Sequence, residues 1–435
     1  MLTAIQCMTH KIRTGYGDSD VQYGNDQESP LQGGGQGNGA SLPLWLAISC
    51  ILLSVLESAV TGVHVYSSIS LQLLSFIAII YVDDTDILLT DISGKDTLNK
   101  IFQRAFKAAQ VWQKAVHDSG GAVRPDKCYW TAVDFVFTAG KWRYMKYKEF
   151  DEEIMVKNTD GVYELVERYD INSAKEGLGI FVTPNGAINK QLKKILLKVH
   201  TWSDRLHQSF LNQRESYIGA NSTIFKTIEY FFPGTSFTEL QCQQIERALY
   251  RHLMGKLGLS TKCPLAYKFG PPKVQGAALL EVCVSQMIGK LIIFLYQSNI
   301  RSQLSNTFTL SMEAIQIEVG STTQFFSLQF QDYGCLTPAS WLSRLWESLS
   351  NYDVTLSKPD LNMRPPREFD FTLMYKATMA KVFTREELCS INRCRLYLQV
   401  FYLSDIASGN GRKLLREAYE GQILTQQQSK WQWPR

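Results

Sequence analysis

The amino-acid sequence predicts an α+β fold, with antiparallel strands and helices in its first part and a mostly helical region after it. Between residues 75 and 183, short apolar runs alternate with turn residues, which is typical of strands. From about residue 187 onward, apolar residues recur with a helical period, and the breaks fall near prolines. With 435 residues, of which 45% are hydrophobic, the chain is long enough for several domains, and its composition excludes intrinsic disorder.

The charge and the cysteine content of the chain indicate the kind of partner and the cell compartment that we expect. The chain has 45 basic and 41 acidic residues, and its net charge of +4 is weak evidence for a polyanionic partner. Nine cysteines lack the paired spacing of metal sites, so we expect reduced thiols in an intracellular protein of the nucleus or cytoplasm. The apolar runs 42–56 and 71–80 are shorter than the ~20 residues of a membrane span. They predict a buried helix and a buried strand, and no membrane partner.

The elements of the first part follow from capping residues, apolar runs and turns. Ser41 and Pro43 predict a helix over 43–58, because serine accepts a free amide hydrogen bond and proline has no amide hydrogen. Two apolar runs separated by Asp83-Asp84 predict a β-hairpin. A helical period over 96–117 ends at Gly120-Gly121. The strands that we expect are 75–82 and 85–90 in the hairpin, then 128–137, 141–150, 154–168 with a turn at 158–161, and 177–183.

The helical region begins with a helix over 187–206 that has an apolar stripe and a basic face. The stripe consists of Leu192, Ile195, Leu196, Val199 and Trp202, and the basic face of Lys190, Lys193, Lys194 and Lys198. Four lysines on one face are suited to salt-dependent contacts with nucleic-acid phosphates, and an ordinary solvated face is the alternative. The helices that follow are expected to break near Pro233, Pro264, Pro271-Pro272 and Pro365-Pro366, with a loop over 267–275.

The tetrapeptide Tyr81-Val82-Asp83-Asp84 points most directly to a function. Two adjacent carboxylates repel each other, and both stay ionised only where a positive charge lies beside them. A divalent cation such as Mg²⁺ is the usual partner, and Mg²⁺ typically shares its ligands between carboxylates and substrate phosphates. The alternative is a polar turn in an ordinary hairpin, since aspartate is a favoured turn residue. Asp86 adds a third carboxylate on the return strand, where we expect it to be solvated.

A glycine-rich loop, Gln32 to Ala40, leads directly into the helix that starts near Ser41. Its amides and the helix N-terminus are suited to binding phosphate. The loop also fits a loose dinucleotide-binding pattern, but such a pattern should follow a buried strand, and residues 25–30 do not read as one.

Together these motifs resemble the palm of a reverse transcriptase of the retrotransposon or retroelement kind. The resemblance is carried by the Gln-Gly loop 36–41 and, in the same order as in the family, by the Tyr-x-Asp-Asp hairpin. The segment from Ser119 to Cys128 resembles the stretch after the next palm helix. Residues 177–180 resemble the strand leading to the primer grip. The likeness covers about residues 12–200.

The resemblance implies an RNA-directed DNA polymerase, a nucleotidyltransferase that works through two metal ions, Mg²⁺ or Mn²⁺. Its partners would be an RNA or DNA template with a primer and a dNTP. Asp83 would be the principal metal ligand and Asp84 its neighbour. The residues near template, primer end and incoming nucleotide would be Gln36, Gly37, Ser41, Tyr81 and Val82. Lys127 would approach the pyrophosphate leaving group, with a solvated strand-end lysine as the alternative.

The sequence departs from the family in two ways. Leu42 stands where the family has proline directly after the motif serine, with the proline displaced to Pro43. The family also places a further metal-binding aspartate upstream of the Gln-Gly loop, and Asp18 and Asp20 lie instead in a stretch that reads as a loop. We therefore expect an N-terminally truncated polymerase fragment that does not synthesise DNA alone.

Three functional domains follow from this interpretation: a partial palm over 1–186, a helical thumb-like region over 187–330, and a helical C-terminal region of unassigned role over 331–435. Two other hypotheses stay open. One is a non-catalytic nucleic-acid-binding remnant of a mobile element. The other is an unrelated α+β interaction protein in which the Asp-Asp hairpin is a plain turn.

Overall fold

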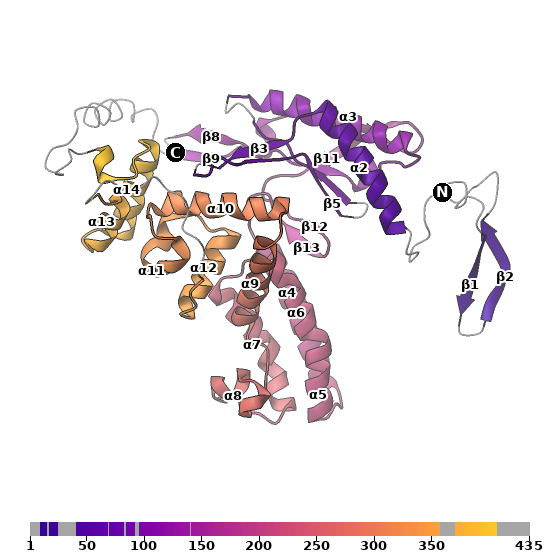
Figure 1. The fold of residues 1–435 in the computed structure, drawn as a ribbon. Helices are drawn as coiled ribbons and strands as arrows, with labels where there is room; N and C mark the ends of the chain where they lie inside the picture. Colours follow the sequence, from indigo (N-terminus) through magenta and orange to yellow (C-terminus); the bar gives the residue numbers. More distant parts are fainter. Residues whose placement is uncertain are drawn as a thin grey trace. The chain divides into compact units, whose positions relative to one another are not determined.

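The computed structural model describes residues 9–14, 17–24, 41–67, 69–81, 84–91, 95–139, 141–356 and 370–406. These residues form small sheets and many helices, which confirms the predicted α+β class (Figure 1). The chain divides into two compact units. The first comprises Met1–Val65, Ser75–Ala132 and Tyr147–Tyr169, and the second comprises Tyr66–Leu74, Val133–Lys146 and Asp170–Arg435. This division does not test the three predicted functional domains, which stay a prediction.

The first unit begins with a strand pair and continues with helices and short strands. Its elements are β1 (Thr9–Thr14), β2 (Gly17–Gly24), α2 (Ser41–Ala59), β5 (Ala78–Tyr81), β6 (Asp84–Ile87), α3 (Leu98–Asp118), β7 (Tyr129–Trp130), β10 (Ile154–Lys157) and β11 (Tyr163–Arg168). Strands β3 (Val63–Tyr66) and β4 (Leu73–Phe76) pair with each other where the chain passes between the units. The predicted helices over 43–58 and 96–117 and the existence of the hairpin are confirmed. The predicted strand over 75–82 is wrong as a single element, because it divides between β4 and β5. The expected burial of the two apolar runs is also only partial, since Leu46 and Ile51 of α2 and Ile79 of β5 are exposed.

The core of the first unit lies between α2, α3 and the β5–β6 hairpin. Leu56, Val60, Ile77 and Ala108 are buried there, and Trp112 packs against them. The C-terminus of α3 is closed as the sequence predicts, because Gly120 adopts a φ of +86° and the Gly121 amide donates to the Val116 carbonyl at 2.9 Å. Two helices thus support the hairpin that carries the aspartates.

A small mixed sheet in the first unit has the order β10-β11-β7, with β10 antiparallel and β7 parallel to β11. The predicted turn at 158–161 is confirmed, since the Asn158 side chain accepts hydrogen bonds from the amides of Asp160 and Val162 at 2.9 Å each. Arg168 stacks over the Trp130, Tyr147 and Phe150 rings. Its guanidinium also donates to the Tyr147 carbonyl at 3.0 Å.

The predicted strand over 128–137 is wrong as a single element. Tyr129 and Trp130 pair with Glu167 and Arg168 in the first unit, whereas β8 (Phe135–Thr138) pairs with β9 (Lys141–Tyr144) in the second. The predicted strand over 141–150 likewise ends at Tyr144, and a 3-10 helix, Tyr147–Glu149, follows. Both errors share one cause: a run of strand-forming residues does not show which distant segment each half will pair with.

The predicted strand over 177–183 is also wrong, because this segment forms a tight hairpin. Strand β12 (Lys175–Gly177) pairs with β13 (Ile180–Val182), and Gly177 lies opposite Ile180. The two residues between the strands, Leu178 and Gly179, have φ values of +51° and +79°, which are typical of a two-residue turn that matches the strand twist.

Helices make up most of the second unit, as predicted. They are α4 (Asn189–Gln208), α5 (Gln213–Gly219), α6 (Phe225–Phe231), α7 (Glu239–Lys256), α8 (Leu265–Phe269), α9 (Val282–Ser298), α10 (Gln303–Val319), α11 (Phe330–Tyr333), α12 (Trp341–Asn351), α13 (Leu373–Met379) and α14 (Arg385–Tyr397). The expected break at Pro233 is confirmed by a 3-10 helix, Phe232–Gly234. The predicted loop over 267–275 is partly wrong, since it contains the end of α8 and a 3-10 helix, Pro272–Val274.

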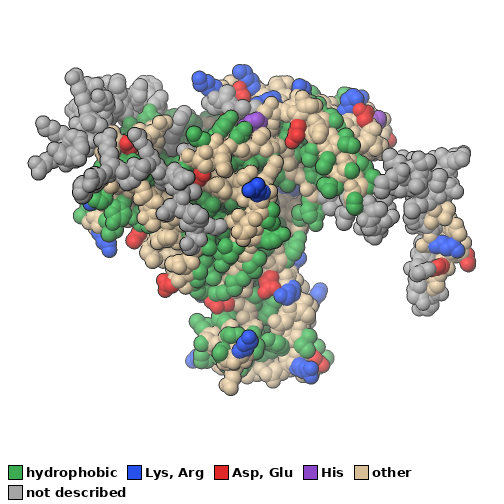
Figure 2. Space-filling view, viewed as in Figure 1, with side chains coloured by type: hydrophobic (Ala, Val, Ile, Leu, Met, Phe, Trp, Pro, Cys, Tyr) green, Lys and Arg blue, Asp and Glu red, His purple; other side chains and the backbone are tan. Residues whose placement is uncertain are grey.

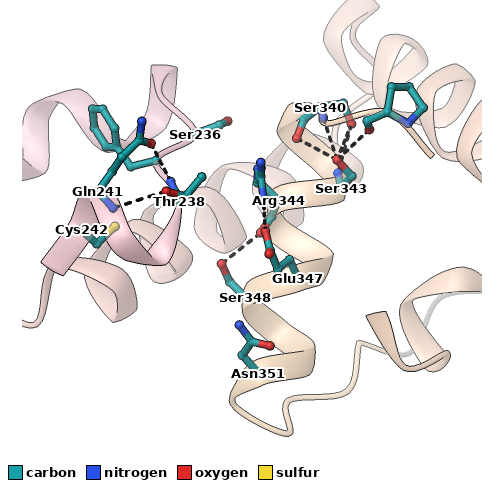
Figure 3. Close-up of polar contacts among 12 residues, drawn as sticks. Ser236, Thr238, Gln241, Cys242, Ser340, Ser343, Arg344, Glu347, Ser348 and Asn351 are labelled. Atoms are coloured by element: carbon teal, nitrogen blue, oxygen red, sulfur yellow. Dashed lines mark hydrogen bonds and ion pairs between the residues drawn. The ribbon is translucent and has the colours of Figure 1, made fainter. Parts of the chain in front are cut away.

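Reciprocal side-chain caps fix the starts of α7 and α12 (Figure 3). In α7 the Thr238 hydroxyl accepts from the Gln241 amide at 3.3 Å, and the Gln241 side chain accepts from the Thr238 amide at 2.9 Å. Ser340 and Ser343 form the same arrangement at α12. Such caps satisfy amides that have no partner within the helix.

Two hydrophobic clusters hold the second unit together. The first includes the apolar stripe predicted for α4, with Ile195 and Val199 buried against α7 residues such as Leu249. The second extends from Met287 to Leu388 and centres on Trp346.

Apolar side chains also gather on the surface of the helical region (Figure 2). Helix α9 contributes the exposed residues Ile288, Ile292, Leu295 and Tyr296. None of the described helices, α2 included, has the length and hydropathy that a bilayer span requires.

Candidate metal centre and nucleic-acid interface

The aspartate-bearing hairpin turns one residue earlier than the sequence suggested. Tyr81 pairs directly with Asp84, and Ala78 pairs with Ile87 at the other end of the ladder. The connection is therefore Val82-Asp83 rather than Asp83-Asp84, and Asp84 is the first residue of β6. Val82 and Asp83 lie outside the described residues. Tyr81 and Asp84 are both exposed, with 58% of Tyr81 accessible to solvent.

Asp84 shares one face of β6 with Asp86, because side chains two residues apart on a strand point the same way. Partial burial of the Asp86 carboxyl raises its pKa, and the negative charge of Asp84 raises it further. Tyr129 of β7 lies near both. Burial raises the pKa of the Tyr129 phenol, and the charge of Asp86 is the next largest cause. The Tyr129 ring packs against Tyr169 with ring centroids 5.3 Å apart.

This arrangement concentrates negative charge in a small area beside a phenol. Oxygen atoms from Asp84 and Asp86 are the kind of ligand that Mg²⁺ and Mn²⁺ prefer. Burial is the main reason that the pKa of Asp86 is raised, and a divalent cation there would offset the further contribution from the negative charge of Asp84. Among the described residues, which exclude Asp83, no three His, Cys, Asp or Glu side chains are grouped so that they could hold a metal ion.

Asp86 and Tyr129 are the site residues whose role the sequence did not predict. Strand alternation gave a usable signal for Asp86, because Asp84 and Asp86 are two residues apart. No local signal existed for Tyr129, which reaches the hairpin from a strand more than 40 residues later in the chain.

The structure describes only some of the other residues that were predicted to contact the nucleotide. Gln36 and Gly37 lie outside the described residues. Ser41 is the first residue of α2, whereas the sequence predicted it to precede the helix, and its side chain is not described. Lys127 is exposed at the end of a 3-10 helix, Pro125–Lys127, two residues before Tyr129. The described residues show no hydrogen bond or ion pair between Lys127 and either Asp84 or Asp86.

The four lysines predicted as a phosphate-binding face divide into two pairs. Lys190 donates to the Ala174 carbonyl at 3.1 Å and lies 4.4 Å from the centroid of the Phe181 ring. Lys194 forms an ion pair with Glu176 and donates to the Gly179 carbonyl at 2.7 Å. These two lysines therefore fasten α4 to the β12–β13 hairpin.

Lys193 and Lys198 are both exposed on α4. Lys198 lies over the Phe231 ring, 5.4 Å from its centroid. Within the part of the chain that the structure describes, neither lysine forms an ion pair. Of the four lysines, these two remain available to a phosphate backbone.

The division of the lysines predicts distinct effects on duplex binding. We expect Lys193→Glu with Lys198→Glu to weaken binding of a primed duplex and to reduce the slope of log K against log salt by about 1–2. Lys190→Gln with Lys194→Gln should instead lower thermal stability, because it removes the contacts to residues 174–179. Salt-dependent fluorescence anisotropy and thermal melts measure the two effects. Unchanged anisotropy for the Lys193/Lys198 variant would support an ordinary solvated helix face.

Comparisons of this chain with models of protein families, with curated proteins and with solved structures found no match.

Proposed function

We propose that the chain is a reverse-transcriptase-like protein that binds divalent cations at Asp83-Asp84 and a primed nucleic acid along α4. One observation carries the proposal. The β5–β6 pairing allows only two residues in the turn, so consecutive aspartates stand at the end of a hairpin that α2 and α3 support. The exposed position of Asp84 and the nearby acidic Asp86 support a cation site there.

Each residue has a defined part in this proposal. Asp83 and Asp84 would supply carboxylate ligands, and Asp86 would add charge that attracts the cation. The metal, when bound, would stabilise the charge that develops on transferring phosphates. Exposed Tyr81 would contact the primer end or the incoming dNTP, and Lys193 and Lys198 would contact the backbone of the duplex.

We expect binding without synthesis. Two adjacent carboxylates hold one cation weakly and do not position two. Asp18 and Asp20, which the sequence predicted to lie in a loop, are instead exposed residues of strand β2. The test is primer extension with purified protein, Mg²⁺, dNTPs and a primed RNA template. The expected result is a mobility shift of the primed template with no extended product. Robust incorporation would contradict the expected lack of synthesis.

A non-catalytic nucleic-acid-binding remnant is the second candidate, favoured by the exposed Lys193 and Lys198 of α4, which form no ion pair with any residue that the structure describes. The two candidates differ in their response to metal. In the remnant, duplex binding would be indifferent to Mn²⁺ and to Asp83→Asn. In the reverse-transcriptase-like protein, Mn²⁺ should strengthen binding of a primed template together with a dNTP, and Asp83→Asn should remove that increase.

A further inference from the structure

Helix α14 is attached to the segment 331–336 by one row of side chains. Arg385 donates to the Gln331 carbonyl at 3.1 Å, and Asn392 donates to the Leu336 carbonyl at 3.0 Å. Between them, the Cys389 thiol donates to the Cys335 carbonyl at 3.0 Å. These three side chains lie four and three residues apart, and so share one face of the helix.

This contact brings two cysteines together. Cys389 Sγ lies 3.0 Å from the Cys335 carbonyl oxygen, and the Cys335 thiol itself donates to the Asp332 carbonyl at 4.0 Å, so the two cysteines are neighbours at this contact. Both cysteines are free and partly exposed, so a small oxidant can reach them. Burial raises the pKa of the Cys335 thiol, and the positive Arg385 guanidinium partly offsets this effect.

A second pair of neighbouring thiols offers a contrast. Cys242 of α7 and Cys283 of α9 belong to the same hydrophobic cluster, but Cys242 has only 1% of its surface exposed. The neighbouring Cys283 thiol, followed by burial, raises the pKa of Cys242 far above its usual range, so its thiolate is scarce. Because the thiolate is the nucleophile, this pair should resist oxidation.

We propose that Cys335 and Cys389 form a reversible disulfide that fastens α14 to the segment 334–336 when the protein meets a low-molecular-weight disulfide such as oxidised glutathione. One cysteine thiolate attacks a glutathione sulfur, forms a mixed disulfide and releases one glutathione thiolate. The second cysteine then loses its proton and attacks the mixed disulfide, which releases the second glutathione. The protein dithiol is oxidised and one oxidised glutathione is reduced to two glutathione molecules.

The bond would link residues 54 positions apart in the chain. Closing so long a loop restricts the unfolded state and should raise the melting temperature of the oxidised protein. Because the Cys335 pKa is raised, formation of the disulfide should become faster as pH rises above neutrality.

The test is to incubate the full chain with oxidised glutathione at several pH values, block free thiols, and map peptides by mass spectrometry without reduction. The expected product is a peptide pair joined through Cys335 and Cys389 that has lost two hydrogen atoms and separates on adding dithiothreitol. Cys335→Ser and Cys389→Ser should each abolish this product. Cys394→Ser, on the same helix, should leave it intact.

Exposed Cys50 reports whether the oxidant is active, because it should form a mixed disulfide with glutathione under the same conditions. The proposal is overturned if Cys50 is modified while Cys335 and Cys389 stay unlinked. It is also overturned if Cys242 and Cys283 are linked before Cys335 and Cys389. Neither readout depends on cation or nucleic-acid binding, so the outcome is independent of the proposed function.

Discussion

Replacing Lys290 by methionine is expected to raise the free energy of unfolding at pH 6 by about 2–4 kcal/mol. Lys290 of α9 is only 1% exposed, and its ammonium donates to the Ser236 hydroxyl at 2.7 Å and to the Trp341 carbonyl at 3.4 Å. Burial, followed by the positive charge of Arg344, lowers the pKa of Lys290 from 10.5 to about 7. Below pH 7 the folded protein therefore carries a buried charge, a cost that methionine removes.

The sign of the pH dependence follows from the lowered pKa. Between about pH 7 and 10.5 the unfolded chain holds the proton of Lys290 while the folded protein has released it. The free energy of unfolding contributed by this group should therefore rise with pH over that window. Lys290→Met should remove this rise.

Urea denaturation of the wild type and Lys290→Met at several values from pH 6 to pH 10 measures both effects. The matched control is Lys226→Met on α6, where the lysine side chain is 70% exposed. This substitution should change neither the free energy of unfolding nor its dependence on pH appreciably. The contradicting result is a Lys290→Met protein that is destabilised at pH 6 and whose free energy of unfolding depends on pH as in the wild type. It would show that the folded protein accommodates the ammonium well.

Truncating Trp346 to alanine is expected to lower the free energy of unfolding by about 3–5 kcal/mol. This side chain is fully buried at the centre of the second cluster of the helical unit. Its ring meets Phe325 and Phe330 edge-on, with centroids 5.3 and 5.0 Å away. The indole nitrogen donates to the Leu328 carbonyl at 2.9 Å. Alanine would leave a cavity and an unsatisfied carbonyl.

Trp346→Phe separates the two contributions, because phenylalanine keeps much of the apolar volume but has no donor for Leu328. We expect this variant to lose about 1–3 kcal/mol, less than the alanine variant. Denaturant titration followed by circular dichroism measures both. Equal losses for the two variants would mean that the hydrogen bond, and not packing, dominates at this position.

The helices and the Asp-Asp hairpin were predictable because their signals are local. Helices α3 and α4 carry apolar residues at helical spacing, and Gly120-Gly121 ends α3 where its left-handed φ requires a glycine. Strand partners were not predictable, since the run 128–137 divides between two units. The run 177–183 folds back at Leu178-Gly179, and its residues alone could not show whether it continues or turns.

The candidate site was predicted in part. The acidic hairpin follows from the sequence, whereas the proximity of Tyr129 depends on tertiary packing that no local pattern encodes. The lysine face of α4 was also predicted, but not that Lys190 and Lys194 bind the β12–β13 hairpin. Periodicity identifies the face of a helix on which a lysine lies but not which carbonyl or carboxylate lies within its reach.

The proposed function depends on cation binding by the consecutive aspartates, and Mn²⁺ titration followed by electron paramagnetic resonance tests it most directly. The test variants are Asp83→Asn and Asp84→Asn. The matched control is Asp160→Asn, in the ordinary turn between β10 and β11. We expect the wild type and Asp160→Asn to bind Mn²⁺ with the same affinity. Asp83→Asn and Asp84→Asn should each bind it at least about tenfold more weakly. Equal Mn²⁺ binding by all four proteins would contradict the proposed site.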